Sequence, residues 1–158
     1  MTYQVAVCGP RNCTEVESAA AYRVGELLAD QGVTILCGGG SGVMAAVAAG
    51  GRSRDGLVIG VRPNDSREGS SPDLSATIVT NLGEARNAVI VWSADAVIVI
   101  GGSWGTLSEL ALAKRRGGIR VVSLAGWQLL DAEGRPVPGV DTADSPEDAV
   151  RQALTSRA

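Results

Sequence analysis

The sequence contains 158 residues, 45% of them hydrophobic and 3% aromatic, and it carries a formal net charge of −3 at neutral pH. This length is typical of one domain, so residues 1–158 are expected to fold as a single unit. An acidic chain with few aromatic side chains lacks the basic surface and the stacking platforms of nucleic-acid-binding proteins. It contains no apolar run near the roughly 20 residues that cross a bilayer, and no signal-peptide pattern at its start. We therefore expect a cytoplasmic protein whose partner is neither a nucleic acid nor a membrane.

The chemistry available to the chain is narrowed by the absence of histidine. Without histidine there can be no Ser-His-Asp triad, no Cys-His pair and no His-ligated zinc. The three cysteines, Cys8, Cys13 and Cys37, match neither a disulfide framework nor the paired spacing of a zinc site. We expect them to be buried or strand-end thiols, and no metal site is predicted. Acid–base chemistry would have to use carboxylates, Lys, Tyr, Cys or the ligand itself.

Short apolar runs alternate with segments of helical pattern along the chain. Strands are predicted at residues 4–8, 33–37, 57–61, 76–79, 96–100 and 120–124, and helices at residues 14–31, 43–49, 81–92, 106–116 and from 146 onward. Capping boxes are predicted to start three of the helices, at Thr14 with Glu17, at Asn81 with Glu84 and at Thr106 with Glu109. Residues 62–73 are expected to form an exposed or mobile loop, and residues 127–142 to be irregular.

The predicted strands are apolar throughout rather than at every second residue, which is typical of a parallel sheet buried on both faces. Together with the alternation of strands and helices, this predicts an α/β fold, a single Rossmann-like, doubly wound parallel sheet with helices on both faces. Ligands of such sheets bind outside the carboxyl ends of the strands, where the strand order reverses. Three segments should reach that edge, at residues 9–12, 38–42 and 101–106.

Two of these segments are rich in glycine and run directly into a helix. This arrangement exposes backbone N–H groups at the positive end of a helix dipole, where phosphate is the usual occupant. The alternative is that both are only tight strand-to-helix turns. The G-x-G-x-x-A pattern at residues 40–45 is a weak dinucleotide signature, because it follows the second strand and no ribose-binding acid follows on schedule. The candidate phosphate-binding residues are Gly9, Arg11, Gly38, Gly39, Gly40, Ser41, Gly42, Gly102, Ser103, Trp104, Gly105 and Thr106.

Glu109 has two interpretations. It can complete the capping box that begins at Thr106. It can instead project into the pocket, because it lies one turn inside a helix that starts at the ligand edge, and there stabilise an oxocarbenium-like sugar or activate a water. Trp104 is likewise either a core or interface residue or a wall that stacks on a ligand ring. Arg86, taken alone, would be a solvated arginine on a helix.

Three motifs in combination resemble the LOG family, which was once labelled "lysine decarboxylase-like". They are Gly38-Gly-Gly-Ser-Gly-Val-Met44, Glu84-Ala-Arg-Asn87 and Gly101-Gly-Ser-Trp-Gly-Thr-Leu-Ser-Glu109. The resemblance implies that Arg86 and Glu109 match the catalytic pair of enzymes that hydrolyse cytokinin nucleoside 5′-monophosphates. It also implies that the glycines of both loops and Thr106 form a phosphate cradle, and that the chain is a homo-oligomer, a dimer or tetramer.

Within that superfamily the chain is most similar to the short branch that includes molybdenum-cofactor carrier proteins. Asn87 stands where the enzymes have lysine, Gly101 where they have proline, and Ser103 where they have glycine. Two functions therefore stay open. One is binding of a phosphorylated nucleotide-like or pterin-like molecule, with the molybdenum cofactor as candidate cargo and Asn87 among the contacts. The other is a phosphoribohydrolase that needs no metal or other cofactor. A lysine decarboxylase is not expected, since no pyridoxal-binding lysine is apparent.

Overall fold

The computed structural model describes residues 1–155, and within them seven parallel strands form one sheet in the order β4-β3-β2-β1-β5-β6-β7. The strands are β1 Gln4–Cys8, β2 Thr34–Cys37, β3 Val58–Arg62, β4 Ala76–Val79, β5 Ala96–Ile100, β6 Arg120–Leu124 and β7 Asp141–Ala143. The helices are α1 Glu15–Asp30, α2 Val43–Arg52, α3 Arg86–Ser93, α4 Trp104–Arg116 and α5 Pro146–Leu154, with a 3-10 turn η1 at Gly83–Ala85. The predicted α/β, doubly wound parallel sheet is confirmed.

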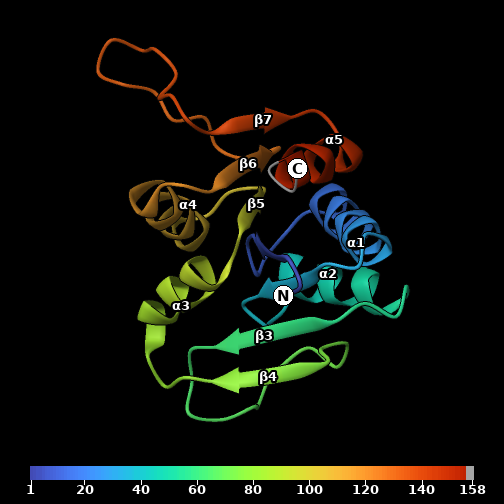
Figure 1. Ribbon diagram of the computed structural model, residues 1–158. Helices are drawn as coiled ribbons and strands as arrows, with labels where there is room; N and C mark the ends of the chain where they lie inside the picture. The colour runs from blue at the N-terminus through green and yellow to red at the C-terminus, as the bar shows by residue number, and fades with distance from the viewer. Residues whose placement is uncertain (156–158) are drawn as a thin grey trace.

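Helices cover both faces of the sheet (Figure 1). Helices α1, α2 and α5 lie on one face, and α3 and α4 lie on the other. Strands β2 and β5 are buried along their whole length and β1 from Val5 onward, as their largely apolar sequences require. Among residues 1–155, no helix is both long and apolar enough to cross a membrane.

Small residues allow α1 and α2 to pack with their backbones in contact. A Cβ atom added at Gly50 would lie 1.9 Å from the carbonyl oxygen of Tyr22, and one added at Gly25 would lie 2.3 Å from that of Val47. These distances are far below van der Waals contact, so neither position accepts a side chain. The close packing fixes α2 relative to α1.

The strand order reverses between β1 and β5. The chain leaves β1 through α1 to pair β2 on one side, whereas β5 pairs β1 on the other side, with Cys8 opposite Val99. The loops that follow β1 and β5 therefore diverge from adjacent strand ends toward opposite faces of the sheet. Such a divergence opens a crevice at the carboxyl edge.

Two predictions about local structure are wrong. Asn81 does not cap a helix, because it has a φ of +52° and Gly83 one of +56°, so helical geometry begins only with η1 and α3. The segment at 127–142 is not wholly irregular, since its last residues begin the edge strand β7. Before β7, this segment projects away from the body of the domain (Figure 1, orange). The three cysteines are free thiols, and Cys8 and Cys37 are buried at strand ends, as expected.

Candidate functional site

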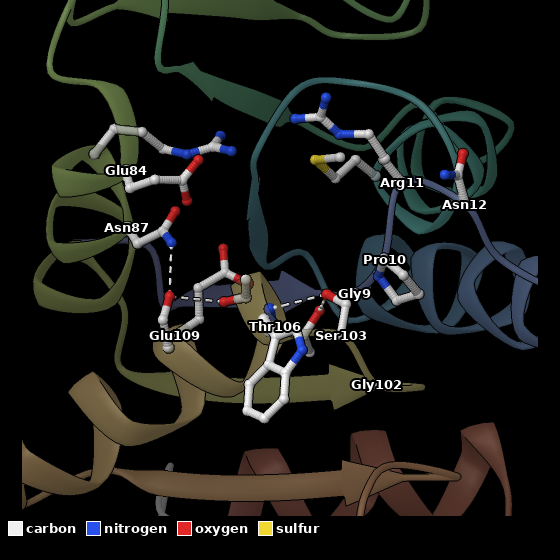
Figure 2. A pocket seen from close by; sticks show the side chains of 15 residues that line it. Gly9, Pro10, Arg11, Asn12, Glu84, Asn87, Gly102, Ser103, Thr106 and Glu109 are labelled. Atoms are coloured by element: carbon white, nitrogen blue, oxygen red, sulfur yellow. Dashed lines mark hydrogen bonds between the residues drawn. The ribbon is translucent and has the colours of Figure 1, made fainter.

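A cavity of about 600 Å³ lies at the point where the strand order reverses. This volume is within the range of small-molecule sites. Figure 2 shows Glu84 and Asn87 on one wall, from η1 and α3, and Arg11 and Asn12 on the opposite wall, from the loop after β1. The other lining residues are Gly9, Pro10, Met44, Arg86, Gly102, Ser103, Trp104, Gly105, Thr106, Ser108 and Glu109.

The start of α4 forms one side of the cavity. Ser103 is the N-cap residue of α4, and its Oγ accepts the backbone N–H of Thr106 at 3.2 Å and lies 2.9 Å from the Thr106 hydroxyl. The predicted capping box of Thr106 with Glu109 is therefore wrong, because the helix begins three residues earlier. The N–H groups of the first turn have no partner within a helix, and the positive end of the helix dipole lies with them. A phosphate at this end of the cavity would be favoured.

Glycine is required for different reasons at Gly102 and at Gly105 of this loop. A Cβ added at Gly102 would lie 2.2 Å from Cδ1 of Trp127, so packing alone excludes a side chain there. A Cβ added at Gly105 would meet nothing closer than Ser103 Oγ at 3.9 Å, although Gly105 lines the cavity in the first turn of α4. Internal packing does not explain Gly105, whereas close approach of a ligand to the backbone does.

Arg86 is buried, with 7% of its surface exposed, although it lines the cavity. Its Nη1 donates to the carbonyl oxygens of Gly38 at 2.9 Å and Val61 at 2.6 Å, which ties α3 to the ends of β2 and β3. Its Nε is buried without a hydrogen-bond partner among the described residues. Arg86 is therefore not a solvated arginine. It is a fixed positive charge at the wall of the cavity.

Glu109 is also 7% exposed and lies in the second turn of α4. Burial raises the pKa of its carboxyl group from an ordinary 4.5 to about 7, although the charge of Arg86 and a hydrogen bond with the Cys8 thiol act in the opposite direction. The Cys8 pKa is raised well above its ordinary value, by burial first and then by the charge of Glu109. The Cys8 thiol is thus protonated at neutral pH, while Glu109 is divided between its neutral and charged forms. A carboxyl group with this pKa can hold or release a proton near pH 7.

Asn87 connects the two helices that frame the site. Its Nδ2 donates to Ser108 Oγ at 2.9 Å, and Ser108 Oγ donates in turn to the carbonyl oxygen of Gly105 at 2.7 Å (Figure 2). Its Oδ1 is buried and has no partner among the described residues. Asn87 therefore braces α3 against the first turns of α4, and it adds no charge to the cavity.

Trp104 is not a core residue, because 79% of its surface is exposed. Its ring meets Trp127 edge-on, with the centroids 5.2 Å apart and the planes at 84°. Since Trp104 also lines the cavity, its ring is available at the rim of the site.

The first glycine-rich loop lies beside this cavity rather than in it. Gly40 and Ser41 line a neighbouring cavity, whereas Gly38, Gly39 and Gly42 line neither of the two. Their glycines have local explanations. A Cβ at Gly38 would lie 2.4 Å from Met44 Sδ, and Gly39 and Gly42 have φ of +71° and +66°. For these three positions, the alternative of a tight turn accounts for the sequence.

Sequence reasoning missed several wall residues, although the signal was present. Met44, Glu84 and Ser108 all lie within the three LOG-like motifs, beside the candidate residues. Pro10 and Asn12 lie in the predicted turn after β1. The contact of Cys8 with Glu109 joins residues that are 101 positions apart, and no local pattern marks it.

Comparison with known proteins gives a relative over nearly the full length of the chain and an enzyme that matches part of it. An uncharacterized protein of Archaeoglobus fulgidus is 38% identical over 153 residues, covering 97% of this chain and 95% of its own. A cytokinin riboside 5′-monophosphate phosphoribohydrolase of Mycobacterium tuberculosis is 38% identical over 93 residues, which is 57% of this chain and 50% of the enzyme.

Solved structures are similar over the whole chain. The molybdenum cofactor binding protein of Rippkaea orientalis has a TM-score of 0.90 at 33% identity, covering 100% of this chain and 99% of that one. The molybdenum cofactor carrier protein of Chlamydomonas reinhardtii has a TM-score of 0.80 at 28% identity, covering 98% and 99%. The model of the SLOG cluster4 family matches residues 2–150. The chain therefore belongs to the SLOG cluster4 family, within the LOG-like superfamily and close to its molybdenum-cofactor carrier branch.

Proposed function

We propose that this protein binds a phosphorylated, nucleotide-like or pterin-like small molecule in the cavity between β1 and β5. The observation that carries the proposal is the first turn of α4. This turn lines the cavity, and Gly105 carries no side chain there although internal packing leaves room for one. The ligand's phosphate would lie there, and its ring would extend toward the exposed face of Trp104.

The similarity to molybdenum cofactor binding proteins makes that cofactor the leading candidate cargo. The residues present fit an anionic ligand, because Arg11 and Arg86 line the cavity beside the positive end of α4. In the bound state the backbone of α4 would hold the phosphate, Arg86 would supply fixed positive charge, and Glu109 would hold or release a proton. Function as a carrier requires no bond of the cargo to change.

A second function is favoured by one specific feature. Arg86 and Glu109 match the catalytic pair of the LOG enzymes, and both are buried at the wall of the same cavity. In a phosphoribohydrolase, the Glu109 carboxylate would stabilise the oxocarbenium-like sugar while the N-glycosidic bond to the base breaks. Water would then add to the anomeric carbon and its proton would pass to the departing base, giving free base and ribose 5-phosphate. Asn87 argues against this function, because it stands where the enzymes have lysine and its uncharged side chain donates a hydrogen bond to Ser108.

One pair of assays separates these functions. The purified protein is mixed with AMP, with an isopentenyl-adenosine monophosphate and with purified molybdenum cofactor, and both ligand-induced stabilisation and release of free base are measured. A carrier shows a raised melting temperature without base release. Base release by the wild type that is lost in Glu109→Gln would instead establish the hydrolase. A protein that none of the three ligands stabilises, and that releases no base, would contradict both functions.

A further inference from the structure

A second cavity of about 440 Å³ lies beside the first. The two share four wall residues, Arg11, Met44, Glu84 and Arg86. The second cavity is completed by Arg62 at the end of β3, by the first glycine loop and by the loop after β3. A molecule bound in the first cavity could therefore extend past Met44 into the second.

The second cavity is lined by three arginines, Arg11, Arg62 and Arg86, and by one acidic residue, Glu84. Within residues 1–155, none of the three arginines forms an ion pair with a carboxylate. The excess positive charge contrasts with the net charge of −3 of the whole chain. Uncompensated guanidinium groups that converge on a cavity are the usual way to bind phosphate-like anions.

Arg62 is held in place rather than left free at the surface. Its Nη2 donates to the carbonyl oxygen of Glu68 at 3.0 Å, and its Nε is buried without a partner among the described residues. The pKa of Arg62 is lowered, by burial first and then by the charges of Arg86 and Arg11. Arg86 and Arg11 thus act unfavourably on the charge of Arg62, and a bound anion would relieve that repulsion.

The first glycine loop leaves room for this arrangement. A Cβ added at Gly40 would lie 3.0 Å from Arg62 Nη1 and 3.1 Å from Met44 Cε. A side chain at this position would enter the gap between the guanidinium group and the boundary of the two cavities. The glycine that the LOG-like motif supplies here therefore keeps Arg62 accessible to a ligand.

We propose that Arg11, Arg62 and Arg86 form a second anion subsite, so that the ligand of this protein carries two separate anionic groups. One group would lie at the first turn of α4, and the other among the three arginines. This inference rests on the proposed function for its first subsite. A nucleoside monophosphate would fill only that first subsite, whereas a ligand with an anionic group at each end would fill both.

Selenate, a tetrahedral dianion, is a suitable probe for both subsites. Binding stoichiometry is measured by isothermal titration at constant ionic strength, and the sites are located by anomalous scattering in soaked crystals. The wild type is expected to bind two equivalents. Arg62→Gln and Gly105→Asp should each bind one, because the first removes a guanidinium group and the second places a carboxylate at the start of α4. Affinity at the altered subsite should fall about tenfold or more.

Two further variants control for charge and for folding. Arg67→Gln removes the same charge from an exposed position in the same loop that lines neither cavity, and should keep both equivalents. Arg62→Lys keeps the charge and should keep the second equivalent. The inference is overturned if the wild type binds one equivalent that Arg62→Gln leaves unchanged, or if the wild type binds two equivalents and folded Arg62→Gln keeps both. The first of these results leaves the proposed function standing, whereas absence of any selenate binding would contradict both.

Discussion

Replacing Glu109 by glutamine should make the stability of this protein less dependent on pH. The folded protein holds the Glu109 carboxyl at a pKa of about 7, against an ordinary value of 4.5, chiefly because the group is buried. Below about pH 4.5 the carboxyl is neutral in both the folded and the unfolded chain, so its ionisation does not lower the free energy of unfolding. As the pH rises toward 7, the unfolded chain releases this proton first, and the folded state loses stability relative to it.

The size of the loss follows from the two pKa values. A tenfold change in proton affinity corresponds to about 1.4 kcal/mol, so the shift from 4.5 to about 7 corresponds to about 3 kcal/mol. The loss is complete above about pH 7, where both states are ionised. Glutamine stays neutral throughout. The free energy of unfolding of Glu109→Gln, relative to that of the wild type, should therefore rise by about 3 kcal/mol from acidic to alkaline pH.

The assay is urea denaturation of both proteins at intervals from about pH 5 to 8.5, where linear extrapolation gives the free energy of unfolding. The quantity to compare is the difference in free energy of unfolding between the two proteins at each pH, because the contributions of all other titrating groups are common to both and cancel. A matched control is Glu15→Gln, which neutralises an exposed carboxyl at the start of α1. A difference for Glu109→Gln that stays constant with pH would refute the argument that burial controls this carboxyl.

Predictions for four further variants concern the walls of the cavity. Arg86→Met leaves two strand-end carbonyl groups without their donor and should lower the free energy of unfolding by about 3 kcal/mol in urea denaturation. Gly102→Ala forces the Trp127 ring to move and should lower the free energy of unfolding by about 1–3 kcal/mol. Gly105→Ala should leave the free energy of unfolding almost unchanged and should weaken AMP binding measured by calorimetry. Ser103→Gly should cost a few tenths of a kcal/mol and strengthen AMP binding, because it frees the N–H that Ser103 now caps.

The sheet could be predicted from the sequence because its signals are local and strong. Runs such as Ala96–Ile100 are apolar at every position, and the polar turns between them mark their ends. The edge strand β7 could not be predicted, because it has three residues and only Ala143 is buried. The start of α3 was placed too early because Asn81 and Glu84 have the spacing of a capping box, while the left-handed backbone of Asn81 depends on contacts with the loop after β3.

The candidate site was predictable where a residue's role depends on its place at a strand end. Gly9, Arg11 and the loop after β5 line the cavity because parallel strands end at one edge. The role of the first glycine loop cannot be read from its sequence, since a glycine required by packing and a glycine required by a ligand form the same pattern. Only the atoms around Gly38 and Gly105 distinguish the two cases.

The charge state of Glu109 also separates the two proposed functions. A bound phosphate disfavours a nearby carboxylate, so binding should raise the Glu109 pKa above 7 and take up a proton. Affinity should then fall as the pH rises through neutrality, and Glu109→Gln should remove that fall while leaving the titration of the phosphate itself in place. A hydrolase needs the opposite state, because only the ionised carboxylate stabilises an oxocarbenium ion. Its turnover should rise over the same interval. An affinity for AMP that depends on pH in the same way in both proteins would show that Glu109 does not face the bound phosphate.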